Sequence, residues 1–221
     1  MRDRTGIGAR GSRMALLTLL TPLACGDGST GVRDQPVPDI TLPVRVHLLT
    51  SRIPELSSAL SDSQVAALIA RANEVWGAAG IGWSLESVVR EAAQNETAIE
   101  QALAGVTPLT STLLASAFPS AELSGAWDVF FVPDLTFAGV PGVYFPSIPM
   151  AVSSELDPAG LGDPGRILAH ELGHSLSLPH VACTAAGNLM SPGCAGSDRT
   201  RLASGQVEQA RAQAREGSPA R

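Results

Sequence analysis

The sequence predicts an α+β domain, and three observations lead to this class. A strand, an amphipathic helix and a second strand follow one another over 41–89. A run typical of a buried strand, Trp127–Val132, lies in the middle of the chain. A helix then begins at Asp163, and a last helix is expected over 204–215. Elements of these kinds and lengths pack as a sheet covered by helices.

The first strand covers Thr41–Thr50, where apolar and polar residues alternate. His47 falls on the polar side of this alternation, beside Arg45. Two interpretations of His47 are open, a contact to a substrate or metal and an ordinary surface position. We favour the surface position, because histidine is only intermediate in its tendency to be buried.

The helix that follows spans Ser63–Trp76, where apolar residues recur at helical spacing. Asp62 or Ser63 can cap its first turn, because a short polar side chain accepts from free backbone N–H groups there. Gly77 or Gly80 can end it.

The middle of the chain has weaker patterns. A second strand is expected over 81–89, and one or two helices over 91–118 with a break near Pro108. Glycine and proline punctuate 133–149, and Met150–Ser154 has the length and composition of a short strand.

The most specific feature of the chain is the pattern H-E-x-x-H in a predicted helix, with a third histidine six residues later. His170 and His174 are four residues apart, so both project from one face of the helix. Pro179 prevents the helix from continuing, and a turn there lets His180 approach the same point from another direction.

Three neutral imidazoles with an open fourth position are typical of a catalytic zinc site rather than a structural one. Glu171 lies one residue step around the helix from His170, where it can hold a metal-bound water. The alternative is a buried helix whose histidines are satisfied by hydrogen bonds. Three of the four histidines of the chain fall in this short window, which argues against that alternative.

This spacing resembles the signature of the metzincin metallopeptidases, H-E-x-x-H-x-x-G-x-x-H followed by a methionine turn. Asn188-Leu-Met190-Ser-Pro192 matches the turn. The resemblance implies a zincin-like catalytic domain with a twisted mixed sheet, a long backing helix, an active-site helix and a small C-terminal lobe ending in a helix. It also implies that Met190 lies beneath the metal and that Glu171 is the general base of a zinc endopeptidase.

One position departs from the family pattern, because Ser177 stands where glycine is usual. Glycine adopts a left-handed backbone freely, and serine does so at a cost of about 1 kcal/mol. The resemblance further implies an edge strand above the metal, to which we assign Gly142, Val143 and Tyr144. Main-chain pairing along such an edge would hold protein or peptide substrates of varied sequence.

Composition restricts the partners of the protein. The 221 residues fit one domain and a leader, and the net charge is −6 without any lysine or basic run. Nucleic acid is therefore not expected as a partner. No apolar stretch is long enough to cross a bilayer as a helix. We expect a monomer.

The N-terminal residues have the arginine-rich start and short apolar segment of an export signal. Cys25 resembles the lipidated residue of a bacterial lipoprotein, and we favour this over ordinary cleavage near Ala24 or a latency contact from Cys25 to the metal. The protein is then exported, to the envelope, the periplasm or the medium, and a lipid at Cys25 is its only expected membrane contact. The expected organisation is a signal at 1–25, a flexible linker at 26–39, a catalytic domain at 40–216 and a disordered tail at 217–221.

Cys183 and Cys194 flank the methionine turn and could form a disulfide, in agreement with an oxidising compartment. Zinc ligation by either cysteine is a weaker alternative, because three histidines already complete a catalytic set. One zinc ion is the expected cofactor. Calcium stays open at a loop that holds Glu155, Asp157 and Asp163, for which solvated acids are the default interpretation.

Two other functions fit the same motif. The protein could be a zinc hydrolase of an amide other than a peptide bond. It could also be a non-catalytic envelope protein that keeps the metal for stability or partner binding. The intact ligand set and the glutamate weigh against the second of these.

Overall fold

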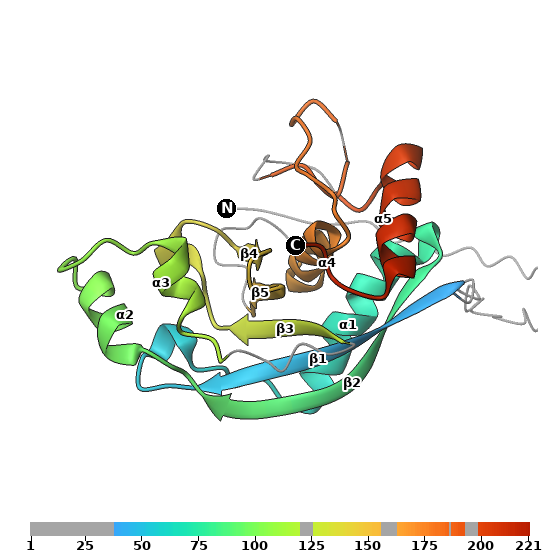
Figure 1. Cartoon of the computed structure of the whole chain (residues 1–221). Coiled ribbons are helices and arrows are strands. Elements are labelled where there is room, and N and C mark those ends of the chain that lie inside the picture. The colour runs from blue at the N-terminus through green and yellow to red at the C-terminus, as the bar shows by residue number, and fades with distance from the viewer. Residues whose placement is uncertain (1–37, 120–125, 156–162, 186, 193–198) are drawn as a thin grey trace, which may run out of the picture. The chain divides into compact units, whose positions relative to one another are not determined.

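A computed structural model describes residues 38–119, 126–155, 163–185, 187–192 and 199–221, and within them five strands form one sheet (Figure 1). The strands are β1 (Ile40–Thr50), β2 (Ile81–Ala92), β3 (Trp127–Val132), β4 (Gly142–Phe145) and β5 (Met150–Ser154). The helices are α1 (Asp62–Trp76), α2 (Glu96–Leu103), α3 (Ser111–Ala115), α4 (Pro164–Ser175) and α5 (Ser204–Glu216). Short 3-10 turns cover Pro54–Leu56, Gly77–Ala79 and Thr136–Ala138. All these elements belong to one unit, Gln35–Arg221.

The sheet is mixed, with the strand order β2-β1-β3-β5-β4. β1 runs parallel to β2 and β3, and β3 runs parallel to β5. Only β4 is antiparallel, paired with β5 from Gly142 opposite Ser153 to Phe145 opposite Met150. The predicted α+β class and mixed sheet are confirmed.

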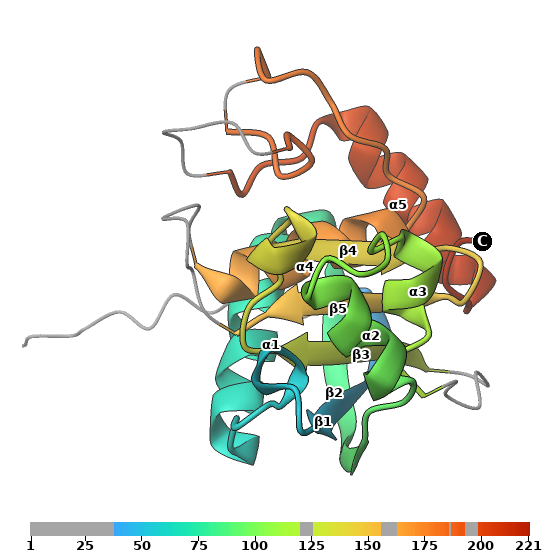
Figure 2. The ribbon, with the colours of Figure 1, turned by 90° about the vertical axis from the view of Figure 1, so that its left-hand side faces the viewer.

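Helices cover both faces of the sheet (Figure 2). On one face, α1 and α4 pack with Val44, Val46 and Leu48 of β1 in the larger apolar cluster. On the other face, α2 and α3 pack with Leu49 and Phe130 in a second cluster. Because both faces are covered, every residue of β3 is buried, which explains its nearly unbroken apolar sequence.

The first turn of α1 is capped one residue earlier than expected. Ser61 accepts from the N–H of Gln64, and the Gln64 side chain accepts from the N–H of Ser61 at 2.9 Å. The expected caps, Asp62 and Ser63, were wrong because Gln64 at the third helical position completes a reciprocal capping box with Ser61. The helix ends at Gly77 as predicted, and Gly80 then turns the chain into β2 with a φ of +67°.

α4 is fixed against α1 and the sheet. The Asp163 side chain accepts from the N–H of Gly165 at 2.8 Å and pairs with Arg71 of α1. The indole of Trp76, also on α1, donates to the carbonyl of Ala169 at 3.1 Å. Leu168 and its apolar neighbours on α4 are fully buried. A helix anchored in this way holds its side chains in defined positions.

His47 does not lie on the surface, which corrects the favoured interpretation. Its residue is 4% exposed, and its ring stacks on Phe130 at 4.5 Å. Nδ1 lies 2.5 Å from Oε1 of Glu91 and Nε2 lies 3.0 Å from Oδ1 of Asp128. The polar face of β1 is buried because α2 and α3 cover it, and two carboxylates from neighbouring strands compensate for burial of the imidazole.

We expect His47→Ala to destabilise the fold by about 3 kcal/mol, since removal of one partner from a buried charged group leaves the other unpaired. Urea unfolding of the parent and the variant measures this loss. The zinc content is expected to stay unchanged, because His47 lies outside the histidine cluster described below. A variant as stable as the parent would contradict this account of the Glu91–His47–Asp128 group.

The end of the chain also differs from prediction. The tail at 217–221, expected to be disordered, turns back at Gly217 with a φ of +70°. The N–H of Ala220 donates to the carbonyl of Ser175 at 2.8 Å, and the Gln213 side chain donates to the carbonyl of Ser218 at 2.9 Å. The first hydrogen bond joins residues far apart in sequence and the second depends on the turn at Gly217, so local composition could not indicate either of them.

The predicted signal at 1–25, including Cys25, lies outside the described residues, as does the linker up to residue 37. In the part of the chain that is described, no helix combines the length and apolar character that crossing a membrane requires.

Candidate metal centre

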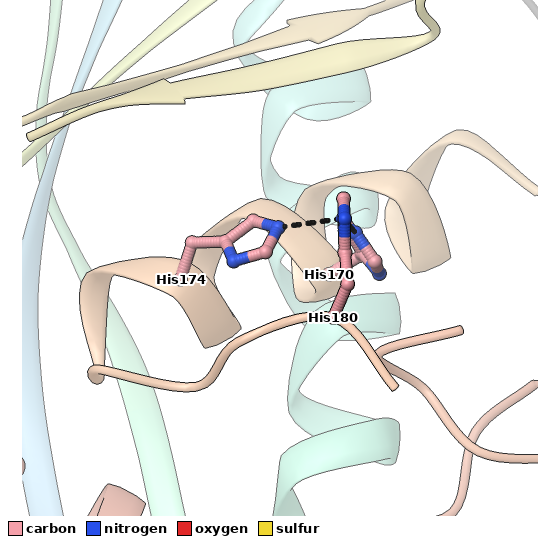
Figure 3. A group of neighbouring side chains, drawn as sticks. All are labelled: His170, His174 and His180. Carbon is pink, nitrogen blue, oxygen red and sulfur yellow. Dashed lines mark hydrogen bonds between the residues drawn. The ribbon is translucent and has the colours of Figure 1, made fainter. Parts of the chain in front are cut away.

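Three histidine side chains meet at one point beside α4 (Figure 3). His170 and His174 come from α4, one turn apart, and His180 comes from the segment that follows the helix. The Nε2 atom of His180 lies 3.1 Å from Nε2 of His170 and 3.1 Å from Nε2 of His174. The structure therefore brings together the three residues that the motif singled out.

The backbone orients two of these rings. Nδ1 of His170 lies 2.7 Å from the carbonyl of Leu189, and Nδ1 of His174 lies 2.8 Å from the carbonyl of Leu178. Because a carbonyl only accepts, Nδ1 carries the proton and each Nε2 presents its lone pair to the cluster. Burial lowers the pKa of His170 to about 4 and also lowers the pKa of His174. Both rings are thus held neutral, which is the metal-binding form.

Ser177 adopts the left-handed backbone that its position requires, with a φ of +66°. The N–H of Ser177 donates to the carbonyl of His174, and the N–H of Leu178 donates to the carbonyl of Gly173, both at 3.0 Å. This is a Schellman helix end, which demands the left-handed residue. The Ser177 hydroxyl donates to Gln213 of α5 at 2.8 Å. The turn and α5 together compensate for serine in place of glycine.

The methionine turn packs against α4. Met190 is fully buried, and a Cβ atom at Gly173 would lie 2.5 Å from its sulfur. The bare α-carbon of Gly173 therefore permits the close approach of this side chain to the helix that carries His170 and His174. The preceding residue, Leu189, supplies the carbonyl that orients His170.

Glu171 lies in a cleft of about 890 Å³ together with the three histidines. Its residue is 4% exposed, and burial raises the pKa of its carboxyl group to about 8. The cleft is bounded on one side by β4, to which Gly142, Val143 and Tyr144 belong. Among the described strands, β4 pairs only with β5 and so forms one edge of the sheet.

Tyr144 is engaged by the C-terminal segment. Its hydroxyl donates to the carbonyl of Ala220, and burial raises its pKa. Ala220 and Arg221 line the cleft with it. The sequence did not indicate this contact, because the two partners are 76 positions apart.

Two arginines that line the cleft were missed at the sequence level. Arg166 is 7% exposed and lowers the pKa of His170 by its charge, although burial is the larger cause. It precedes His170 by four residues, so the helical spacing that paired His170 with His174 could have found it. Arg199 is also buried, and it donates to the carbonyl of Ser191 at 3.0 Å. Nothing in its local sequence placed it near the histidines.

The remaining predicted residues are only partly described. Cys183 is disulfide-bonded, and Cys194, its predicted partner, lies outside the described residues. Of the three acids considered for calcium, Asp157 also lies outside the described residues. The carboxylate of Asp163 pairs with Arg71 and accepts from the N–H of Gly165 at the start of α4. Glu155 is half-buried, and burial raises its pKa.

The raised pKa of Glu171 predicts a pH dependence for the metal-free protein. The folded state keeps a proton that the unfolded state loses above about 4.5, so stability falls as pH rises towards about 8. His170, with its lowered pKa, acts in the opposite direction below about 6.5. We therefore expect the urea midpoint of chelated protein to drop between about pH 6.5 and pH 8, and to drop less in Glu171→Gln. Equal slopes for both proteins would contradict the assignment of this titration to Glu171.

No protein-family model matches this chain, and no curated protein matches it. Several solved structures are similar to it at low sequence identity. An archaemetzincin from Methanopyrus kandleri is 20% identical over 83% of this chain and 98% of its own, with a TM-score of 0.47. A promirolysin from Tannerella forsythia is 16% identical over 84% of this chain and 86% of its own, with a TM-score of 0.49.

Other similar chains are longer than this one. Metalloproteinase-II from Bacteroides fragilis is 13% identical over 79% of this chain, which spans only 53% of that protein, and the TM-score is 0.45. A chain from a chaperone-substrate complex is 15% identical over 80% of this chain, which spans only 35% of that one, and the TM-score is 0.45.

Proposed function

We propose that this protein is a zinc-dependent endopeptidase in which Glu171 is the general base. The observation that carries the proposal is the convergence of three imidazole nitrogens beside a buried carboxylate in one cleft. Among the residues that the structure describes, the candidate ligand group holds these three histidines and no fourth side chain. Such a set suits a catalytic ion, which keeps one position for water or substrate.

The residues present fit zinc. The hydrogen bonds of Nδ1 leave a lone pair on Nε2 of His170 and on Nε2 of His174, and each of these atoms lies 3.1 Å from Nε2 of His180. A proton on Nε2 of His180 could be donated to only one of these two lone pairs, whereas a cation can accept a lone pair from all three rings. Nitrogens at about 2.0–2.1 Å from a tetrahedral zinc ion are separated by about 3.3 Å, close to the spacing seen here. His170, His174 and His180 would therefore hold the ion.

When bound there, zinc would polarise the carbonyl of the scissile bond and lower the pKa of a water molecule. Glu171 accepts the proton of that water and passes it to the leaving amine. Burial raises the pKa of Glu171 in the metal-free site, and the positive charge of a bound zinc ion would lower it again, which favours the carboxylate form that a general base requires. The carbonyls of Leu178 and Leu189 keep the imidazoles oriented during these steps.

The edge position of β4, which pairs with no described strand except β5, supports a peptide as substrate. An extended chain can pair with such an edge through its main chain, and the side chains of Val143 and Tyr144 border the same cleft. Pairing of this kind places a backbone amide near Glu171. It also tolerates varied sequences, because the paired groups occur in every residue.

Two alternatives are kept for the same site, a hydrolase of a non-protein amide and a non-catalytic metal-stabilised envelope protein. The edge strand favours the peptide over a small amide. The buried carboxylate beside the ligands favours catalysis, because burial of an acid is costly and a purely structural metal does not need it. Export, with or without a lipid at Cys25, and a monomeric state remain part of the proposal.

Cleavage profiling tests the proposal. Zinc-loaded protein is incubated with a mixture of unmodified peptides, and the products are read by mass spectrometry. We expect internal cleavage that stops after chelation and returns when zinc is restored. Hydrolysis that survives removal of the metal would contradict the mechanism, and turnover of non-peptide amides alone would favour the first alternative.

A further inference from the structure

Gly142, the first residue of β4, faces the side chain of Glu171 at very short range. A Cβ atom at Gly142 would lie 2.7 Å from Oε1, 2.8 Å from Cγ and 3.0 Å from Cδ of Glu171. Carbon atoms in favourable contact are about 3.5–4.0 Å apart. The carboxylate of Glu171 therefore packs on a surface that exists only because position 142 has no side chain.

The backbone does not by itself require glycine here. The φ of Gly142 lies outside the left-handed region, unlike those of Gly139 and Gly187. An alanine could adopt this strand conformation, so the close approach of Glu171 is what sets the glycine apart.

The backbone is held in place on both sides of this contact. Gly142 pairs with Ser153 of β5, which is fully buried, and the carbonyl of Pro141 accepts from Ser154 at 3.0 Å. On the other side, α4 is fixed by its capping residue and by Trp76. The most movable part is the side chain of Glu171, so a methyl group at position 142 would displace the carboxylate.

We infer that Gly142 is a positioning residue for Glu171, because its bare α-carbon sets where the carboxylate stands relative to the three histidine Nε2 atoms. The inference rests on the proposed function, in which that carboxylate takes the proton of the attacking water. The edge strand β4 then positions Glu171 as well as pairing with the substrate, and Gly142 takes part in both. A displacement of about 1 Å in a catalytic group can cost about 100-fold in rate.

We expect Gly142→Ala to lower kcat about 100-fold with a smaller change in KM and an unchanged zinc content. In a Glu171→Asp background, where the acid is one methylene shorter, the same substitution is expected to lower kcat far less. Gly205→Ala is the matched control, because a Cβ at Gly205 meets no atom within 4 Å and its backbone is helical. It should leave kcat at the parent value in both backgrounds.

A stability cycle on metal-free protein tests the contact without any reaction. Gly142→Ala is expected to lower the urea midpoint in the parent, where the methyl group meets Glu171. In a Glu171→Ala background it should raise the midpoint or leave it unchanged, because alanine restricts the unfolded chain more than glycine does. This change of sign is specific to the contact.

The outcomes separate the two hypotheses. If the parent cleaves peptides and Gly142→Ala keeps the parent kcat, the inference is overturned while the proposed function stands. Equal midpoint shifts in both backgrounds would also overturn it. If the parent cleaves nothing with zinc bound, the proposed function fails and the positioning role fails with it. Three results together support the inference. Gly142→Ala lowers kcat in the parent, it lowers kcat far less in the Glu171→Asp background, and the shift that it causes in the urea midpoint changes sign in the Glu171→Ala background.

Discussion

Glu171→Gln is expected to remove nearly all peptide hydrolysis while zinc stays bound. Glutamine has nearly the same shape as glutamate, so it can keep the packing against Gly142. It cannot accept a proton from the attacking water, and loss of a general base costs about 10²–10⁴-fold in rate. We therefore expect kcat to fall by about 100-fold to 10,000-fold, measured on the best peptide from profiling.

The matched control for this prediction is Glu155→Gln. Glu155 is also a carboxyl group whose pKa is raised by burial, but it lies at the end of β5 and does not line the cleft. Its neutralisation should leave kcat near the parent value. Full activity in Glu171→Gln at equal zinc content would remove Glu171 from the role of base.

His174→Ala has the second largest expected effect, because it removes one of three ligands. His174 contributes an Nε2 atom at 3.1 Å from that of His180, and the carbonyl of Leu178 already orients its ring. Loss of a mere outer-shell partner costs about 10–100-fold in metal affinity, so loss of a ligand should exceed about 100-fold. Competition with a fluorescent zinc chelator measures this affinity, and hydrolysis should disappear in parallel.

His47→Ala serves as the control for the ligand set, since His47 is the one histidine of the chain outside the cluster. It should lower the free energy of unfolding and leave the zinc affinity unchanged. His174→Ala should lower the zinc affinity and leave the stability of the metal-free protein near the parent value. Unchanged zinc affinity in His174→Ala would show that the ion, if bound, is held elsewhere.

The parts of the site that follow from local spacing could be predicted from the sequence. His170 and His174 share a helix face by their four-residue separation, and Pro179 requires the turn that brings His180 back. The left-handed backbone of Ser177 follows from the same helix end. The edge position of β4 was assigned through the family resemblance, and the sheet order agrees with it.

The parts that depend on distant segments could not be predicted. His47 is buried because Glu91 and Asp128 arrive from two other strands and α2 and α3 cover that face. The contact of Tyr144 with Ala220 joins residues whose separation in sequence carries no pattern. The approach of Gly142 to Glu171 likewise depends on how the sheet edge meets α4. The N-cap of α1 was predicted one or two residues too late in the sequence, because several short polar side chains there could each cap the helix.

X-ray absorption at the zinc edge of the purified, metal-loaded protein tests the central claim most directly. We predict one zinc ion per chain, surrounded by nitrogen and oxygen atoms at about 2.0–2.1 Å, with the multiple-scattering pattern of three imidazoles. His180→Ala should remove one imidazole from this pattern. A sulfur neighbour at about 2.3 Å, a fourth imidazole, or protein that binds no zinc would contradict the account.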